Sequence, residues 1–103
     1  DTLADCLEQS ELSESSWQAV GKAIRRLHDA GIWHADLNAR NILMGDSVYL
    51  IDFDRAQRKA GDGWQQNNID RLRRSLDKFA NSLGDKFHFT EQGWQALLSA
   101  YLG

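Results

Sequence analysis

The chain has 103 residues, which is enough for one domain with a single modest hydrophobic core. Hydrophobic residues make up 42% of it and charged residues 26%, and both values are ordinary for a globular domain. No apolar run approaches the roughly 18 residues of a membrane span, and the single cysteine, Cys6, excludes an internal disulfide bond.

Two helices are predicted in the N-terminal third of the chain. The first covers residues 1–12, where Thr2 and Asp5 have the spacing of a capping box. The second is predicted to follow an N-cap at Ser15 and to end at Gly31. Its apolar side chains recur at the spacing of one helical face and predict a buried stripe: Trp17, Val20, Ile24 and Leu27.

A loop and a short β-hairpin are predicted after the second helix. The apolar segments 42–44 and 48–51 predict two strands, and residues 45–47, Gly-Asp-Ser, predict the turn between them. A hairpin returns the chain to its starting point. The residue that follows its second strand, Asp52, is therefore expected to face the loop that precedes its first.

The polar residues that flank the hairpin match the layout of a phosphotransfer site of the eukaryotic-type kinase fold. The pattern H-x-D-L-x-x-x-N is met by four residues of the loop: His34, Asp36, Leu37 and Asn41. The D-F-G position is met by Asp52 and Phe53, with Asp54 in place of the glycine. Each motif by itself is weak evidence, but their order and the hairpin-sized gap between them indicate a kinase-like origin.

The residue types suit the chemistry of phosphoryl transfer, which needs a hydroxyl in line with the γ-phosphate and metal ions that hold the charge. Asp36 is predicted to orient the acceptor hydroxyl and to take its proton. Asp52 is predicted to bind Mg²⁺ that bridges the phosphates of ATP, and Asn41 to complete the metal shell without adding charge. His34 is predicted to brace the loop rather than to act as a base.

Residues 55–67 occupy the position of a kinase activation segment, and they are few and mostly polar. No A-P-E motif follows them, whereas kinases that phosphorylate proteins normally need a longer platform here. A small-molecule or glycan acceptor is therefore expected. Asn38 stands where protein kinases carry a lysine, and it is a candidate to hydrogen-bond the acceptor or the γ-phosphate. Trp64 is predicted to pack this segment down rather than to stack on a sugar ring.

Two more helices are predicted in the C-terminal part of the chain. One covers residues 68–83 and ends at Gly84. Its apolar stripe consists of Ile69, Leu72, Leu76, Phe79 and Leu83. Thr90 is the predicted N-cap of the last helix. The residues of that helix predicted to face inward are Trp94, Leu97, Leu98 and Tyr101.

Charge is distributed unevenly along the chain. Residues 1–54 hold ten acidic and four basic side chains, whereas residues 55–86 hold eight basic and four acidic ones. A basic segment directly after a carboxylate of the Mg²⁺-binding type indicates an anionic substrate or an anionic surface. A solvated charged face without a ligand is the open alternative. Arg71, Arg73 and Arg74 spread around the third predicted helix, and at least one of them is expected to reach back to the site.

The chain resembles the lipopolysaccharide core kinases, and among them the kinases of 3-deoxy-D-manno-octulosonic acid (Kdo), in three stretches: WHADLNARNIL, YLIDFDRA and WQQNNIDRLRRSLDKF. The resemblance covers most of residues 32–78. It implies ATP-dependent transfer of phosphate to a hydroxyl of Kdo on lipid A, at the cytoplasmic face of the inner membrane of a Gram-negative bacterium. It also implies Asp36 as the base, with Asn41 and Asp52 at Mg²⁺.

The same resemblance implies a binding role for the basic side chains. The candidates for binding the anionic acceptor or the lipid headgroup surface are Arg55, Arg58, Arg71 and Arg74. A peripheral contact with the inner membrane is therefore expected, and no nucleic-acid partner.

The predicted fold is mainly α-helical with a small β-hairpin, an α+β arrangement that corresponds to the C-terminal lobe of the protein-kinase-like fold. The chain contains no counterpart of the Gly-rich loop, of the strand lysine that pairs with the phosphates, or of the glutamate that positions this lysine. Residues 1–103 are therefore predicted to form a single C-terminal lobe without its N-terminal lobe. Such a chain is expected to bind ATP poorly and to be inactive by itself.

Two other functions stay open at this point. One is a different small-molecule kinase, related to aminoglycoside or choline phosphotransferases, which share the aspartate–asparagine loop and the I-D-F strand end. The other is a non-catalytic lobe that keeps the fold and a basic surface for an anionic glycolipid. The presence of all three predicted base and metal residues counts against this second alternative.

Overall fold

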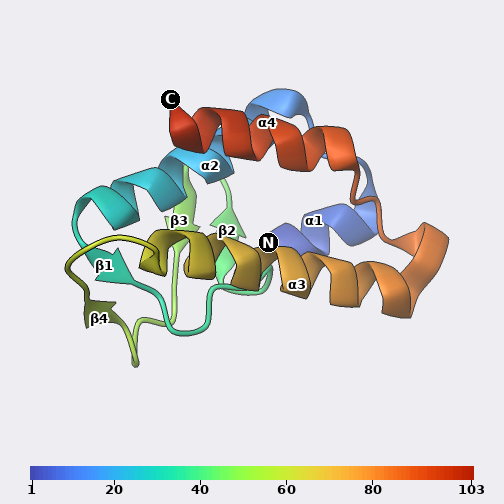
Figure 1. Ribbon diagram of the computed structural model, residues 1–103. Coiled ribbons are helices and arrows are strands. Elements are labelled where there is room, and N and C mark those ends of the chain that lie inside the picture. Colours follow the sequence, from blue (N-terminus) through green and yellow to red (C-terminus); the bar gives the residue numbers. More distant parts are fainter.

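Four α-helices and two small two-stranded sheets make up the computed structural model, which describes residues 1–103 (Figure 1). The helices are α1 (Leu3–Gln9), α2 (Glu14–Asp29), α3 (Trp64–Leu83) and α4 (Glu91–Leu102), and a 3-10 turn covers Gly84–Lys86. The strands are β1 (Ile32–Trp33), β2 (Ile42–Met44), β3 (Val48–Leu50) and β4 (Gln57–Arg58). The prediction of a mainly helical chain with a small hairpin is confirmed.

The predicted hairpin is formed by β2 and β3, which pair antiparallel. Beyond β3, the N–H of Ile51 donates to the carbonyl oxygen of Asn41 at 2.9 Å, so pairing continues up to the residue before Asp52. Asp52 therefore lies at the edge of the loop that carries Asp36, and both side chains line the same hollow.

The second sheet, in which β1 pairs with β4, has no signal in the sequence. Trp33 is opposite Gln57, and the N–H of Lys59 donates to the carbonyl oxygen of Gly31 at 2.9 Å. The ammonium group of Lys59 also lies 4.7 Å from the centre of the Trp33 ring. These contacts tie the segment after Asp52 to the start of the loop.

The helices begin and end differently from the predictions at three points. The capping box of Thr2 and Asp5 is confirmed, but α1 ends at Gln9 because Ser10 has an extended backbone. In α2 the N-cap is Ser13 and not Ser15. Ser13, Ser15 and Ser16 lie close together around the start of this helix, so the sequence offers more than one N-cap. The hydroxyl that accepts a backbone N–H in the structure is that of Ser13.

The third difference is that α3 starts at Trp64, four residues before the predicted start. The side chain of Trp64 packs edge-on against His28, with 5.1 Å between the ring centroids, and its Nε1–H donates to the carbonyl oxygen of Gly61 at 3.1 Å. Packing by Trp64 is confirmed. The polar residues that follow it carry no apolar period, so the first turn of the helix is invisible to periodicity.

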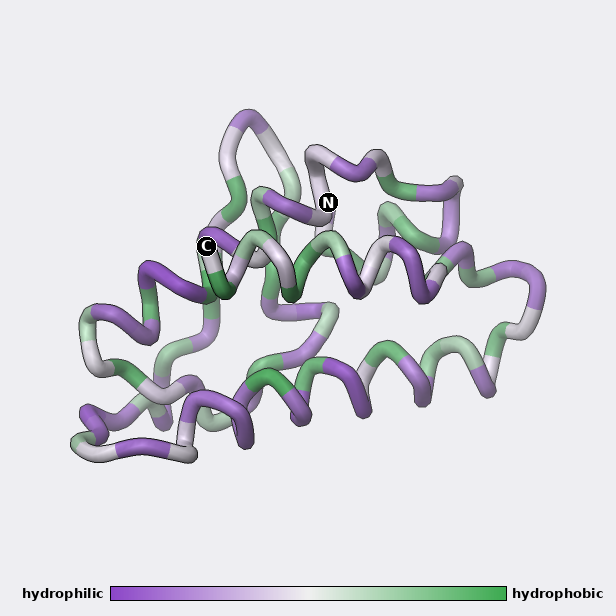
Figure 2. Tube along the Cα trace, turned by 45° about the horizontal axis from the view of Figure 1, so that its top comes forward, coloured by the Kyte–Doolittle hydropathy of each residue, from purple (hydrophilic) through white to green (hydrophobic).

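The core lies between the helices and the hairpin. Figure 2 shows hydrophobic and hydrophilic positions alternating along the helices, as expected where each helix buries one face. The largest fully buried apolar side chains are Trp17, Leu3, Leu7, Ile24, Leu37, Ile42, Leu72, Leu76, Leu97 and Val20. No helix combines the length and the hydropathy that a membrane span requires.

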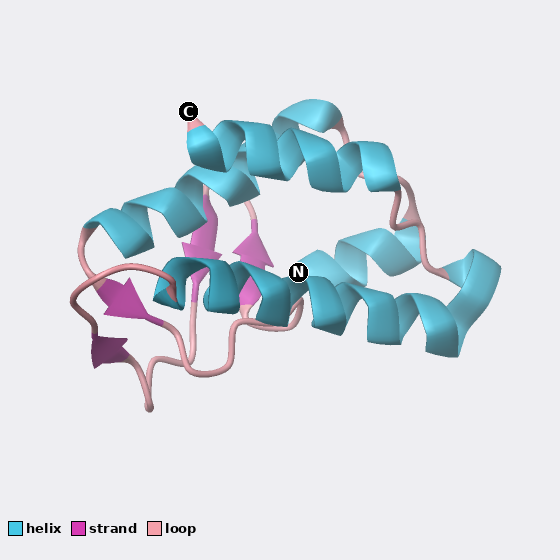
Figure 3. Cartoon of the chain, viewed as in Figure 1, coloured by secondary structure: helices cyan, strands magenta, loops and turns pink.

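In Figure 3 the loop between β1 and β2 runs beside α3. The hydroxyl of Ser75 on α3 accepts the backbone N–H of Ala39 in this loop at 3.0 Å, and the carbonyl oxygen of Ala39 accepts the N–H of Ala4 on α1 at 3.0 Å. The backbone of Ala39 is therefore fixed by hydrogen bonds to α3 on one side and to α1 on the other.

The approach of α2 to α4 depends on a missing side chain. A Cβ at Gly21 would overlap the carbonyl oxygen of Leu97 and lie 3.1 Å from the backbone N of Tyr101.

We expect Gly21→Ala to destabilise the protein by about 1–3 kcal/mol, because backbone atoms cannot rotate away from an added methyl group. Urea unfolding measures this change. Gly45→Ala is the control, since its added Cβ lies 3.8 Å from the carbonyl oxygen of Ser47, and an equal loss in both variants would contradict the explanation.

Candidate active site

A buried asparagine of α3 holds the loop that carries Asp36. The side chain of Asn68 is fully buried. Its Oδ1 accepts the backbone N–H of His34 at 3.1 Å, and its Nδ2 donates to the carbonyl oxygen of His34 at 2.8 Å. Two hydrogen bonds to one residue fix both the position and the direction of the backbone there. Asn68 was not among the predicted site residues, because the sequence carries no sign that this polar residue of the helix is buried.

His34 braces the loop from inside, as predicted. Its Nε2 donates to the carbonyl oxygen of Ile51 at 2.7 Å, and its Nδ1 accepts the backbone N–H of Asp36 at 3.1 Å. A carbonyl oxygen can only accept, so the proton of the neutral ring is on Nε2. The ring centroid lies 5.0 Å from that of Phe53. Both ring nitrogens are engaged, so His34 is not available as a base.

The support of the loop extends to α2 and α4 through His28. Its Nε2 donates to Oδ1 of Asn68 at 3.0 Å, and its Nδ1 accepts the hydroxyl proton of Tyr101 at 2.6 Å. Burial lowers the pKa of His28, because the charged ring would lose its hydration. Burial also raises the pKa of Tyr101 and keeps the hydroxyl group protonated as a donor.

Asn41 lies behind Asp36, within the same turn of the loop. Its Nδ2 donates to the carbonyl oxygen of Asp36 at 2.6 Å and lies 3.4 Å from the carboxylate Oδ2. Asn41 is buried whereas Asp36 is exposed. Because the amide nitrogen is used by the loop, the side-chain oxygen of Asn41 is the atom left to contact a cation.

Asp52 has an unusual backbone conformation. With a φ of 66° it is the one non-glycine residue of the chain in the left-handed region. Aspartate tolerates this region better than most residues, but the conformation still costs free energy. Strain of this kind persists where the surroundings enforce it, and it is frequent at functional sites. The backbone conformation of Asp52 is therefore compatible with the metal-binding position that its motif predicts.

Asp36, the predicted base, and Asp52, the predicted metal ligand, share one hollow, which we call the carboxylate hollow. Its lining residues are Ala35, Asp36, Asp52, Asp54, Arg55 and Arg71. Three carboxylates face two guanidinium groups here, which is an arrangement suited to a cation together with an anion. The third carboxylate, Asp54, stands where protein kinases have glycine.

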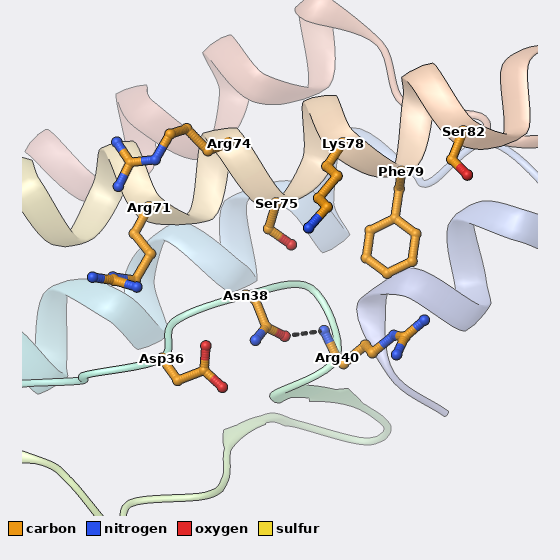
Figure 4. Close-up of a pocket in the computed structure, with 9 residues that line it drawn as sticks. All are labelled: Asp36, Asn38, Arg40, Arg71, Arg74, Ser75, Lys78, Phe79 and Ser82. Atoms are coloured by element: carbon orange, nitrogen blue, oxygen red, sulfur yellow. Dashed lines mark hydrogen bonds between the residues drawn. The ribbon is translucent and has the colours of Figure 1, made fainter.

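A second hollow, which we call the basic hollow, continues from Asp36 along α3 (Figure 4). Its lining residues are Asp36, Asn38, Arg40, Arg71, Arg74, Ser75, Lys78, Phe79 and Ser82. Asp36 and Arg71 line both hollows and therefore mark their junction. Four cationic side chains and a single acidic one make the basic hollow a suitable site for an anion.

The structure brings most of the predicted site residues together. Asn38, Arg71 and Arg74 line the basic hollow, and Arg55 lines the carboxylate hollow. Arg58 lies apart in the exposed strand β4 and lines neither.

Two basic residues of the hollow, Arg40 and Lys78, were not among the predicted site residues. A signal for Lys78 was present, because residues 71, 74 and 78 are spaced three and four apart and must share one face of α3. Arg40 had no such signal, since it lies in an irregular loop.

The residues present fit a magnesium ion that is shared with a nucleotide. No three His, Cys, Asp or Glu side chains converge to hold a metal ion by themselves. Mg²⁺ at phosphotransfer sites takes one or two carboxylates together with phosphate oxygens and water. The carboxylate of Asp52 and the side-chain oxygen of Asn41 are hard donors of the kind this arrangement uses.

Comparison with known proteins supports the kinase interpretation of the two motifs. Residues 1–101 match the model of the lipopolysaccharide kinase (Kdo/WaaP) family. The chain belongs to this family. The resemblance inferred from the loop, strand-end and helix motifs is thereby confirmed. Membership of a kinase family implies a protein-kinase-like fold, which agrees with the helices and the hairpin described above.

Three relatives of this chain carry the name 3-deoxy-D-manno-octulosonic acid kinase. The protein of Haemophilus influenzae (strain PittEE) is 40% identical over 96% of this chain, and that of Actinobacillus succinogenes is 43% identical over 96%. The protein of Pasteurella multocida is 42% identical over 92%. The chain spans 41–42% of the length of these three relatives.

Loss of the hydrogen bonds of Asn68 is expected to destabilise the folded protein. Asn68→Ala leaves the backbone N–H and carbonyl of His34 and the ring N–H of His28 without partners, so we expect a destabilisation of about 2–4 kcal/mol in urea unfolding. Asn67→Ala is the matched control. Asn67 is exposed on the same helix, and its replacement should change stability by less than about 0.5 kcal/mol. Comparable losses at both positions would contradict the role of Asn68.

The pKa of His28 predicts how stability depends on pH. Because its pKa is lowered on folding, the unfolded chain binds this proton more readily, and stability falls as pH drops below the ordinary value of 6.5. Urea unfolding at pH 7.5 and pH 5.5 measures this loss. His28→Gln is expected to lose less stability over the same interval, since the other titrating groups are shared by both proteins. An equal loss in both would show that His28 does not contribute.

Proposed function

We propose that this chain is the C-terminal lobe of a kinase that transfers the γ-phosphate of ATP to a hydroxyl of Kdo-lipid A. The observation that carries the proposal is the shared hollow of Asp36 and Asp52, beside which Asn41 is held by its hydrogen bond to Asp36. These are the residue types and the arrangement that phosphoryl transfer requires.

In this proposal each residue has a separate task. Asp36 accepts the proton of the acceptor hydroxyl as its oxygen attacks the γ-phosphorus and ADP leaves. Asp52 and the side-chain oxygen of Asn41 would hold Mg²⁺, which would supply neutralisation of the charge on the phosphates. Arg55 and Arg71, on the wall of the same hollow, counter the remaining negative charge of the transferred group. Asn38 contacts the acceptor or the γ-phosphate from the basic hollow.

The N-terminal part of the kinase domain is proposed to lie in the portion of the relatives that this chain does not span. That part would supply the Gly-rich loop and the lysine that hold the nucleotide in kinases. The chain itself is therefore expected to bind ATP weakly. Calorimetric titration with Mg²⁺ and ATP tests this expectation, and micromolar binding by the 103 residues would refute it.

The charge of the basic hollow favours an anionic acceptor over the alternatives. Aminoglycosides and choline are cations, and the four basic side chains of the hollow would repel them. Kdo is a sugar acid, so its glycolipid has the required sign of charge. The same basic side chains, together with the exposed Arg58, suit a peripheral contact with anionic lipid at the cytoplasmic face of the inner membrane. The relatives named above come from Gram-negative bacteria, which have such a membrane.

The decisive experiment measures transfer of radiolabelled phosphate from ATP to Kdo-lipid A by the complete kinase that contains this chain. Asp36→Asn is expected to lower kcat by about 10²–10⁴-fold, because the general base is lost. Binding of ATP should be retained. The matched control is Asp46→Asn, which removes an exposed carboxylate from the turn between β2 and β3.

Transfer that survives Asp36→Asn would exclude Asp36 as the base. If the intact protein binds ATP but transfers nothing to Kdo-lipid A, the acceptor is a different one. If cellular function also survives Asp36→Asn, the chain acts as a non-catalytic glycolipid-binding lobe.

A further inference from the structure

The three arginines of the third helix differ sharply in their surroundings. Arg73 is neutralised within the protein, because it forms ion pairs with Asp77 at 3.1 Å and with Glu91 at 2.9 Å. Its guanidinium group also lies over the rings of two aromatic residues of the C-terminal region. Arg71 and Arg74 form no ion pair, and both line the basic hollow. The helix therefore has a structural arginine on one face and two unneutralised ones on another.

The remaining cations of the hollow also form no ion pair. Neither Lys78 nor Arg40 takes part in any of the three ion pairs of the chain. The guanidinium carbon of Arg40 lies 5.1 Å from the centre of the Phe79 ring, which holds it against the wall of the hollow. The backbone N–H of Arg40 donates to Oδ1 of Asn38 at 2.8 Å, drawn as a dashed line in Figure 4.

One donor at the junction of the hollows lacks a partner. The Nε of Arg71 is buried and makes no hydrogen bond. An unsatisfied buried donor is rare in proteins, and it is costly to the folded state. The Nε atom itself is closed off from solvent, but Arg71 lines both hollows, so the rest of its guanidinium group is the part that a carboxylate or phosphate oxygen there would meet.

We infer that the basic hollow is an anion subsite in which Arg74 and Lys78, on one face of α3, hold a carboxylate or phosphate group of the acceptor away from its reacting hydroxyl. The inference rests on the proposed function, since Asp36 marks the reacting end of the hollow. From Arg71 to Lys78 the helix advances about 10 Å. The bound group therefore lies farther along α3 than the reacting end of the hollow, which suits an acceptor that carries a charged group apart from its reacting hydroxyl.

The test uses the complete kinase and the double variant Arg74→Gln with Lys78→Gln. We expect the KM for Kdo-lipid A to rise about 10–100-fold, as is typical for the loss of charged hydrogen bonds. The kcat and the KM for ATP should stay unchanged, because neither residue lines the carboxylate hollow. The control is Lys22→Gln with Arg26→Gln, which removes the same charge from exposed positions of α2. An unchanged KM in the first double variant would overturn the inference.

Modified acceptors identify the group that the subsite binds. One arm uses an acceptor whose sugar carboxylate is a methyl ester, and the other uses an acceptor stripped of its phosphates. The difference between the wild type and the double variant should vanish in the arm that lacks the recognised group. A difference that persists in both arms would show a structural effect of the substitutions and sink the inference.

A probe that does not depend on transfer separates this inference from the proposed function. Inorganic pyrophosphate is titrated into the wild-type protein and followed by NMR at the side chains of Arg74 and Lys78. Shifts at these residues, absent in the double variant, support the subsite even if Kdo-lipid A is not phosphorylated. Transfer that proceeds while pyrophosphate shifts neither residue would leave the kinase proposal standing and exclude the subsite.

Discussion

The paired hydrogen bonds between Asn68 and the backbone of His34 are the constraint on which the rest of the site depends. They join α3 to the loop of Asp36, and through His28 they extend to Tyr101 on α4. Each of these polar groups is buried or half-buried, so its hydrogen bonds cannot be exchanged for bonds to water without cost. The position of an exposed carboxylate is thus secured by a buried polar network between helices that are distant in sequence.

The same network explains why His34 and Asp36 have different surroundings although they are two residues apart. Both ring nitrogens of His34 are used to hold the loop onto Ile51 and onto the N–H of Asp36. The carboxylate of Asp36 faces the junction of the two hollows, beside Arg71. A rigid support behind an accessible acid is the arrangement that precise positioning of a substrate hydroxyl requires.

The third helix serves three purposes through three of its faces. Its apolar face, with Leu72 and Leu76, belongs to the core. Arg73 connects it to the start of α4 through Glu91. The face with Arg74 and Lys78 is left without acidic partners and forms a wall of the basic hollow. Because an α-helix repeats every 3.6 residues, adjacent arginines point in different directions and acquire different roles.

The sequence by itself determined the features that depend on near neighbours: the helices, the hairpin, and the approach of Asp52 to the loop of Asp36. These follow from apolar periodicity and from turn geometry, which act over a few residues. Tertiary structure decided the burial of Asn68, the pairing of β1 with β4, and the separate surroundings of Arg73 and Arg74. Those depend on contacts between segments tens of residues apart, and local sequence patterns carry no record of which polar side chain will find a buried partner.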